Sequence, residues 1–344
     1  MKGKIEGMCL QLKKVLPIGV ITSMLVVSLV LLCACGILPN NKMEYVINED
    51  GTTCTVTGFH NQYIAVLRIP ENIDGYTVTA IAPHAFENFE METVYLPSTI
   101  ETIGEFAFDH CEKLEKVKGI ENCTSLKRIE SFTFASCTNL REIKLPESVV
   151  YIGKVAFSGC YSLQSLSIPH NVITIDMGAF GVCYRVKQIE IPASTINIGE
   201  RVFEGCFSLD TILVDEQNEY WCAEDGVLYS KDMKTLHTYP CGKTDINYTI
   251  PDGVKSIKSY AFAYNSSLES ITIPASVAKI GEYIIDGTSL DASTVKLNTI
   301  NYLGTIDMWN SIVKNSKWDA NSPNYTIYCT DGTITKDGTI TYYQ

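Results

Sequence analysis

The chain of 344 residues carries 27 Lys and Arg against 39 Asp and Glu, which gives a formal net charge of −12. Its 46% hydrophobic and 10% aromatic residues exclude a disordered chain, because they provide enough apolar surface to bury a core. The acidic balance argues against a nucleic-acid partner, since non-specific affinity for DNA and RNA comes mainly from basic residues that neutralise phosphates.

The first 34 residues are typical of an export signal. Lysines precede an uncharged apolar run at 15–32, and Leu-Cys-Ala-Cys-Gly follows at 32–36. A run of this length could also be a retained membrane-spanning anchor, but the small Ala34 before Cys35 favours cleavage. The site resembles the lipobox of bacterial lipoproteins. That resemblance implies removal of residues 1–34, lipidation of Cys35 and a short tether at 35–45, so that the protein is anchored to the outer face of the bacterial cell membrane or cell surface.

After the signal, three kinds of residue recur at one 23-residue step. A fixed period of this length is the signature of a repeat architecture, in which each unit covers its apolar face only by stacking on its neighbours. The markers are Pro146, Pro169 and Pro192; Phe134, Phe157, Phe180 and Phe203; and Cys137, Cys160, Cys183 and Cys206.

One unit contains a strand, a bend and a tight corner. Ile143 and Leu145 alternate with charged residues, as in a half-buried strand that ends at Pro146. Two apolar residues three apart follow at 149–153, and Ala-Phe-x-x-Cys at 156–160 predicts a single-turn helical or 3₁₀ corner. The fold class predicted is a repeat solenoid, in which equivalent strands pair in parallel about 4.8 Å apart.

The units resemble the BspA-like leucine-rich repeats of the treponemal type, whose pattern is Leu-x-x-Ile-x-Ile-Pro…Val-x-x-Ile-Gly-x-x-Ala-Phe-x-x-Cys. The similarity covers about Val46 to Asp286, which places the repeat domain at 46–290. It implies a parallel-β leucine-rich repeat array on the cell surface. Members of the family are associated with binding host or extracellular-matrix proteins, so adhesion is the function that the resemblance implies.

Several segments interrupt the period. We expect a hairpin insertion near 215–245, because Asp225-Gly226 precedes Val-Leu-Tyr as in a tight turn. A hairpin around 49–58 should cover the first coil, and a helix and strand within 291–344 should form a C-terminal cap, since each open end of a solenoid exposes core. The shortened unit at 114–126 predicts a local irregularity.

The cysteines favour packing over chemistry. Five of them occupy one repeat position and should form a buried structural ladder of free thiols, because stacked side chains point in parallel and do not meet disulfide geometry. Cys222 and Cys241 lie in the insertion, where a disulfide remains an alternative. The ladder is too evenly spread to enclose zinc, the five histidines are scattered, and no phosphate-binding glycine motif is present. We therefore predict no catalytic residue, no metal site and no cofactor. The ladder consists of Cys111, Cys137, Cys160, Cys183 and Cys206.

The outward positions of the stacked strands form the candidate binding stripe. Such positions vary freely because the intervening residues fix the core, and repeat proteins commonly bind partners along them. A solvated face with no partner is the alternative. The stripe comprises Thr93, Tyr95, Lys116, Lys118, Glu142, Lys144, Ser165, Ser167, Gln188, Glu190, Thr211 and Leu213.

The function predicted is protein binding by a lipid-anchored surface solenoid, with a host or matrix protein as the partner and the membrane contacted through Cys35. A module that binds carbohydrate or cell-wall polymer is the alternative and would require an exposed aromatic platform. Tyr220, Trp221 and Tyr229 are candidate aromatic contacts, although each could equally pack against its hairpin. An enzyme is the third and weakest hypothesis, and the oligomeric state is open.

Overall fold

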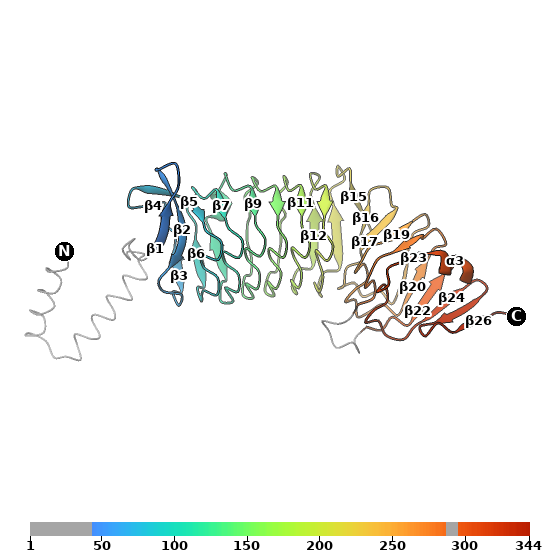
Figure 1. Cartoon of the computed structure of the whole chain (residues 1–344). Coiled ribbons are helices and arrows are strands. Elements are labelled where there is room, and N and C mark those ends of the chain that lie inside the picture. The colour runs from blue at the N-terminus through green and yellow to red at the C-terminus, as the bar shows by residue number, and fades with distance from the viewer. Residues whose placement is uncertain (1–42, 287–294) are drawn as a thin grey trace, which may run out of the picture.

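The computed structural model describes residues 43–286 and 295–344. The expected export signal, the lipidation site Cys35 and most of the tether lie outside these residues. The described chain is an elongated solenoid of short strands, straight through its N-terminal half and bent at the segment that contains β15, β16 and β17 (Figure 1). The predicted fold class, a parallel-β repeat array, is confirmed.

Two stacks of short strands run along the solenoid. The primary sheet surface is formed by the segment of each coil that precedes the proline position of the repeat, and the secondary sheet surface by the segment after it. In the N-terminal half the primary surface contains β3 (Val66–Arg68), β6 (Thr93–Tyr95), β8 (Lys116–Lys118), extended segments at 142–144 and 165–167, β12 (Gln188–Ile191) and β14 (Thr211–Val214). The secondary surface contains β7 (Thr102–Ile103), β9 (Arg128–Ile129), β10 (Tyr151–Ile152), β11 (Thr174–Ile175) and β13 (Asn197–Ile198).

Pairing between coils is parallel and in register. Tyr95 of β6 pairs with Arg68 of β3 and with Lys118 of β8. An isolated parallel bridge joins Lys116 to Glu142, so the register continues into the next coil. Equivalent residues of these four coils therefore form straight rows along the solenoid, as the repeat predicts.

The N-terminal end is closed by a hairpin at the predicted place. β1 (Met43–Ile47) pairs antiparallel with β2 (Thr53–Phe59), and β2 pairs in parallel with β5 (Tyr76–Ile81). The short β4 (Asn72–Ile73) forms a second antiparallel pair with β5. The hairpin thus covers the edge of the sheet that contains β5, whereas β3 remains the edge strand of the primary sheet surface.

In the C-terminal half the two strand stacks continue. One contains β17 (Thr235–Thr238), β19 (Ser256–Ile257), β21 (Lys279–Ile280) and β23 (Val313–Lys314), and the other β18 (Asn247–Thr249), β20 (Ser270–Ile273), β22 (Thr299–Tyr302) and β24 (Thr326–Cys329). Parallel pairing therefore extends beyond residue 290, where the sequence placed the start of the cap. Antiparallel pairing begins with β25 (Gly332–Thr335) and β26 (Ile340–Tyr342), and α3 (Ile306–Ser311) packs beside them.

A column of phenylalanines fills the interior of the N-terminal half. The rings at the Ala-Phe position stack on one another with centroid separations of 5.3–6.1 Å. All of them are buried, and they belong to one apolar cluster that begins at Met43 and extends past the insertion to Ala263 and Tyr264. A second cluster begins with Val227 and fills the C-terminal half. The column comprises Phe86, Phe108, Phe134, Phe157, Phe180 and Phe203.

The corners contain 3₁₀-type turns, which are one of the two corner types that the sequence predicts. The amides of Ala156, Ser158 and Cys160 bond to the carbonyl three residues back, as in a 3₁₀ turn. The intervening amides of Phe157 and Gly159 instead donate to the next coil, at Ala179 and Gly181. Alternate amides are thus used between coils, which prevents a continuous helix and ties each corner to its neighbour. The shortened unit contains the short 3₁₀ helix η2 (Ile120–Asn122), at the predicted irregularity.

The insertion forms a hairpin at the bend. β15 (Trp221–Glu224) and β16 (Val227–Ser230) pair antiparallel around Asp225 and Gly226, both of which have positive φ. Positive φ at both central residues is the geometry of a type I′ turn, for which Asp-Gly is suited. β16 then pairs antiparallel with β17, and parallel pairing resumes between β17 and β19.

Candidate functional site

The candidate stripe lies on the primary sheet surface, where alternate residues point outward. Val117, Ile143 and Leu166 point into the core, and the residues on either side of each are exposed. The twelve predicted residues thus occupy two rows of this surface, with Thr93, Tyr95 and Thr211 half-buried and the remainder exposed. Strand pairing preserves the register from β3 to β8 and from β12 to β14, and a single bridge continues it from Lys116 to Glu142.

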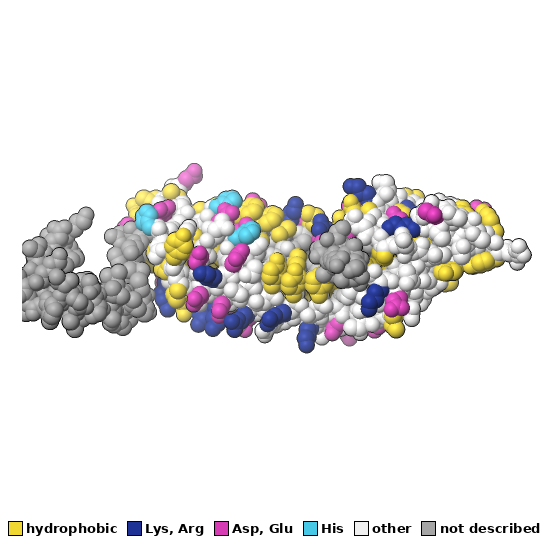
Figure 2. Space-filling model, turned by 90° about the horizontal axis from the view of Figure 1, so that it is seen from below, with side chains coloured by type: hydrophobic (Ala, Val, Ile, Leu, Met, Phe, Trp, Pro, Cys, Tyr) yellow, Lys and Arg dark blue, Asp and Glu magenta, His cyan; other side chains and the backbone are white. Residues whose placement is uncertain are grey.

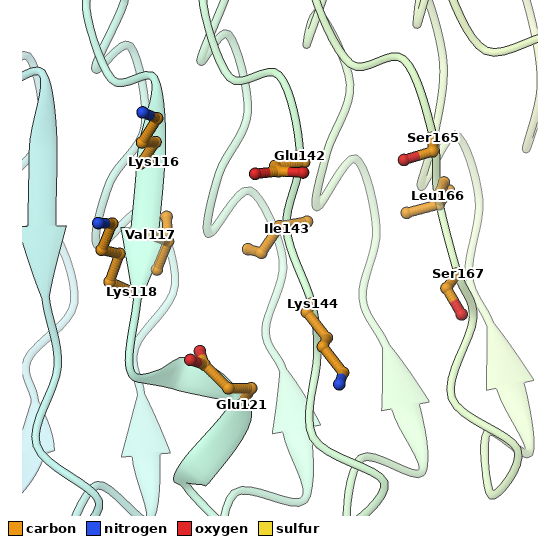
Figure 3. Close-up of a pocket in the computed structure, with 10 residues that line it drawn as sticks. All are labelled: Lys116, Val117, Lys118, Glu121, Glu142, Ile143, Lys144, Ser165, Leu166 and Ser167. Atoms are coloured by element: carbon orange, nitrogen blue, oxygen red, sulfur yellow. The ribbon is translucent and has the colours of Figure 1, made fainter.

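A shallow hollow of about 490 Å³ lies over three neighbouring coils of the stripe. Figure 3 shows Lys116, Glu142 and Ser165 in its upper row and Lys118, Lys144 and Ser167 in its lower row. Glu121 of η2 closes the hollow from below (Figure 3). A second hollow of about 220 Å³ continues along the same stripe and is lined by Gln188 and Glu190 among others.

At the N-terminal end of the lower row, the aromatic ring of Tyr95 lies between two cationic side chains, Arg68 and Lys118. The guanidinium carbon of Arg68 lies 3.7 Å from the centroid of the Tyr95 ring, and Lys118 Nζ lies 5.5 Å from it. Both distances suit cation–π interaction. The two cations lower the pKa of the Tyr95 hydroxyl from its ordinary value, the hydrogen bond with Arg68 being the largest cause. These contacts hold the Tyr95 ring in place on the primary sheet surface, with a positive charge on either side of it.

Sequence reasoning missed Arg68 and Glu121. Arg68 pairs with Tyr95 of β6, and Ile69-Pro70 after it is the marker that could have aligned it with Leu96-Pro97, although the two prolines are 27 residues apart and not 23. Glu121 follows the irregular Gly119, which has φ +89° and approaches the preceding coil so closely that an added Cβ would lie 2.2 Å from the Leu96 carbonyl oxygen. The shortened unit was visible in the sequence, but the direction of its side chains was not.

The five ladder cysteines are buried and repeat one interaction. Each Sγ donates to the carbonyl oxygen of the core phenylalanine of the preceding coil, at 3.1–3.3 Å. Burial raises the pKa of the Cys111 and Cys160 thiols to about 12 and that of the Cys137 thiol well above its ordinary value. Such thiols remain protonated and unreactive at neutral pH.

The two insertion cysteines do not form the alternative disulfide. Both are free thiols. Cys222 Sγ donates to the Ser230 carbonyl at 3.3 Å within its own hairpin. Cys241 is buried at the C-terminal end of the ladder, and burial, with a smaller contribution from Cys206, raises its pKa. Cys222 therefore belongs to the β15–β16 hairpin, and Cys241 to the core cluster of the N-terminal half.

The aromatic residues of the insertion are mostly structural. Tyr229 is fully buried, and the indole of Trp221 donates to a backbone carbonyl of the preceding coil. Only Tyr220 of the three candidates is exposed. None of them therefore forms a flat platform in the manner that sugar binding would need.

A different aromatic row lies at the surface. Tyr161, Tyr184 and Phe207 follow ladder cysteines in successive coils and stack with centroids 4.6 and 5.3 Å apart. Because the rings lie face to face, the row presents ring edges to solvent, whereas stacking on a sugar uses an open ring face. This arrangement does not favour the carbohydrate-binding alternative.

Charged and apolar side chains are interspersed over the surface. In the view from below, Lys and Arg side chains follow one long edge of the N-terminal half, with Asp and Glu beside them (Figure 2). Residues 43–286 and 295–344 contain no group of three or more His, Cys, Asp and Glu side chains placed to hold a metal ion. Within the same residues, no helix has the length and apolar character needed to span a bilayer.

Known proteins share this architecture. The family model of the BspA type leucine-rich repeat region matches residues 53–127, 117–224 and 239–310, in six copies. No curated protein matches the chain.

Three solved bacterial structures are similar. A leucine-rich cell surface protein from Faecalibacterium prausnitzii is 24% identical, covers 80% of this chain and 97% of its own, and gives a TM-score of 0.59. The pneumococcal vaccine antigen PcpA is 23% identical over 78% of this chain and 82% of its own, with a TM-score of 0.63. A leucine-rich repeat protein from Bacteroides ovatus is 25% identical over 76% of this chain and 70% of its own, with a TM-score of 0.54.

Proposed function

Because the chain belongs to the BspA-type leucine-rich repeat family, we propose that it is a surface-anchored adhesion protein that binds a host or extracellular-matrix protein through the primary sheet surface. The observation that carries the proposal is the hollow over Lys116–Lys118, 142–144 and 165–167, where polar and charged side chains surround short apolar strips. Mixed polarity of this kind is typical of surfaces that bind proteins without being permanently covered.

The rigidity of the solenoid supports this function. On the secondary sheet surface, parallel pairs join the coils from β9 to β13, and the corner hydrogen bonds tie successive coils together. These contacts support the stripe where the described primary surface has no paired strands, between β8 and β12. A preorganised surface loses little conformational entropy on binding, which leaves more of the contact energy for affinity. Many weak contacts along the stripe would then add up over several coils.

Anchoring is proposed through lipid on Cys35. The similar Faecalibacterium prausnitzii protein is described as a cell surface protein. A diacyl or triacyl group would hold the chain firmly, whereas one acyl chain gives only marginal membrane binding. Globomycin, which blocks cleavage of lipoprotein signals, should cause the uncleaved precursor to accumulate. The Cys35→Ala chain should incorporate no radiolabelled palmitate. A chain that carries no radiolabelled palmitate when Cys35 is intact would contradict this part of the proposal.

The binding face is tested by blocking it. Full-length chain in detergent is applied to immobilised extracellular-matrix proteins, and bound protein is quantified. Ser165→Tyr with Ser167→Tyr places two bulky rings in the centre of the stripe and should abolish capture. The matched control, Thr102→Tyr with Asn197→Tyr, places the same rings on the secondary sheet surface, at two exposed positions, and should bind as the native chain does. Loss of capture in the control alone would show that the opposite face binds. Capture by purified wall glycan instead of protein would favour the carbohydrate alternative.

A further inference from the structure

Four cations project from the N-terminal end of the stripe without carboxylate partners. The ion pairs of the described residues use other cations, among them Lys113, Arg128 and Arg141. Arg68, Lys116, Lys118 and Lys144 make no ion pair within residues 43–286 and 295–344, and all four are exposed. On a chain with a net charge of −12, this is an unusual concentration of unpaired positive charge.

Three of the cations and one ring form a single row. Arg68, Tyr95 and Lys118 are register partners, and the bridge between Lys116 and Glu142 places Lys144 next after Lys118. At the usual spacing of about 4.8 Å between strands, these four positions span about 14 Å along the solenoid. Like charges at adjacent row positions repel each other, so an anion placed between them would relieve repulsion as well as gain attraction.

The charge of the stripe changes along its length. Beyond Lys144 the same row continues with Ser167 and then the exposed Glu190. Glu121 and Glu142 also line the first hollow, beside the cations. The surface is therefore basic along one row and acidic at defined points around it.

The mixture of cations and glutamates on this surface favours an acidic polypeptide over a uniformly charged polymer as the bound anion. A uniformly charged polymer such as a sulfated glycan would bring negative charge against Glu121 and Glu142 as well as against the cations. A polypeptide can place carboxylates opposite the cations and neutral residues opposite the glutamates, which satisfies both signs. Thr93 and Ser165 add hydroxyl groups that can bond to a peptide backbone.

We propose that the row of Arg68, Tyr95, Lys118 and Lys144 binds an extended acidic segment of a partner polypeptide that runs along the solenoid. The inference rests on the proposed function, because it assigns a partner chemistry to the same face. Carboxylates of the segment contact Arg68, Lys118 and Lys144, and its neutral end lies over Ser165 and Ser167.

The test uses a fluorescent peptide of alternating Glu and Ser and full-length chain in detergent at low ionic strength. We expect anisotropy to report binding that weakens as salt is added, because exposed charges are screened. Arg68→Gln with Lys118→Gln and Lys144→Gln should weaken binding about tenfold or more, as expected for loss of several charge contacts. The control, Lys127→Gln with Lys154→Gln and Lys255→Gln, changes net charge equally at three exposed positions elsewhere and should leave the dissociation constant within about twofold.

A gain-of-function variant keeps the test independent of folding. Ser167→Lys extends the row by one coil and should tighten peptide binding. Equal loss in the two triple variants, or no response to Ser167→Lys, would overturn the proposal. Tighter binding of dextran sulfate than of the peptide, lost in the Arg68 triple variant, would assign the row to a polyanionic glycan instead. If matrix-protein capture is abolished by the two Tyr substitutions but unaffected by the Arg68 triple variant, the binding face stands and the acidic segment is rejected.

Discussion

The indole Nε1 of Trp221 donates a hydrogen bond to the carbonyl oxygen of Ile196 at 3.0 Å. Ile196 precedes β13, the last strand of the secondary sheet surface before the insertion, and His237 Nε2 lies 3.3 Å from the Ile198 carbonyl of the same segment. The side chains of Trp221 and His237 thus contact backbone carbonyls in and beside β13 that a further parallel strand would otherwise pair with. The rings of Trp221 and His237 also meet edge to face at 5.1 Å, which adds to the burial of Leu228 and Cys241 in the N-terminal core cluster in joining the insertion to the straight half.

Replacing Trp221 should weaken this junction. Trp221→Phe keeps a ring but removes the donor, and we expect a loss of about 1 kcal/mol in the free energy of unfolding, the usual net value of one hydrogen bond. Urea unfolding followed by circular dichroism measures it. Tyr220→Phe, next in the chain but exposed, serves as the control and should change stability by less than about 0.5 kcal/mol. Equal effects of the two substitutions would mean that the indole contact has no special role.

The pH dependence of stability should reveal His237. Burial is the main cause that lowers its pKa from 6.5 to about 4, and the positive charge of Lys258 contributes to the shift. Between these values the unfolded chain binds a proton that the folded chain does not, so stability present above pH 6.5 is lost as the pH falls toward 4. The slope from this one group can reach about 1.4 kcal/mol per pH unit.

The measurement is urea unfolding at a series of pH values from 7 to 4. His237→Gln removes the titrating ring, so its curve should be flatter than that of the native chain, whatever its absolute stability. His170→Gln alters a histidine whose side chain is 84% exposed, and should leave the slope unchanged. A His237→Gln curve parallel to the native curve would show that the buried ring does not cause the acid sensitivity.

Thiol labelling should separate the ladder from the insertion. Cys160 is fully buried, donates to the Phe134 carbonyl and has its pKa raised to about 12 by burial. Cys222 is half-buried at the hairpin. Iodoacetamide at pH 8 reacts with thiolate, so mass spectrometry of the native chain should find Cys222 modified well before Cys160. The difference should vanish in denaturant, and similar rates in the folded chain would contradict the burial of the ladder.

How far the sequence predicts the fold depends on the regularity of each coil. The 23-residue period was sufficient to predict parallel rows, because once Phe134 and Phe157 are equivalent, every outward position between them is fixed. At the junction the period fails. Asn265 stands where the ladder has Cys, and its Nδ2 donates to the carbonyls of Cys241 and Lys243, which no repeat pattern specifies. The hydrogen bonds of Trp221 and His237 likewise depend on long-range placement that local sequence does not encode.

The same reasoning applies to the candidate site. The alternation of apolar and polar residues predicted the outward residues of the stripe, because successive side chains of a strand point to opposite faces. It did not give the hollow or the Arg68–Tyr95 stack, which depend on the paths of β3 and of the irregular η2 coil. Side-chain direction in irregular coils is set by packing against neighbours, and one sequence contains no record of that packing.

A glycine tests how closely the coils approach. An added Cβ at Gly153 would lie 2.7 Å from the backbone of Glu130 and Ser131 in the preceding coil, and backbone atoms cannot move aside as a flexible side chain can. Gly153→Ala should therefore destabilise the chain by about 2–3 kcal/mol, in the range of overpacking in a close-packed interior. Glu130 occupies the equivalent corner position and already has a Cβ, so Glu130→Ala should cost less than about 1 kcal/mol, mainly its exposed pair with Arg128. Urea unfolding of both variants measures the difference. A small effect of Gly153→Ala would show that adjacent coils can separate, and that the rows along the stripe are less rigid than the proposed binding requires.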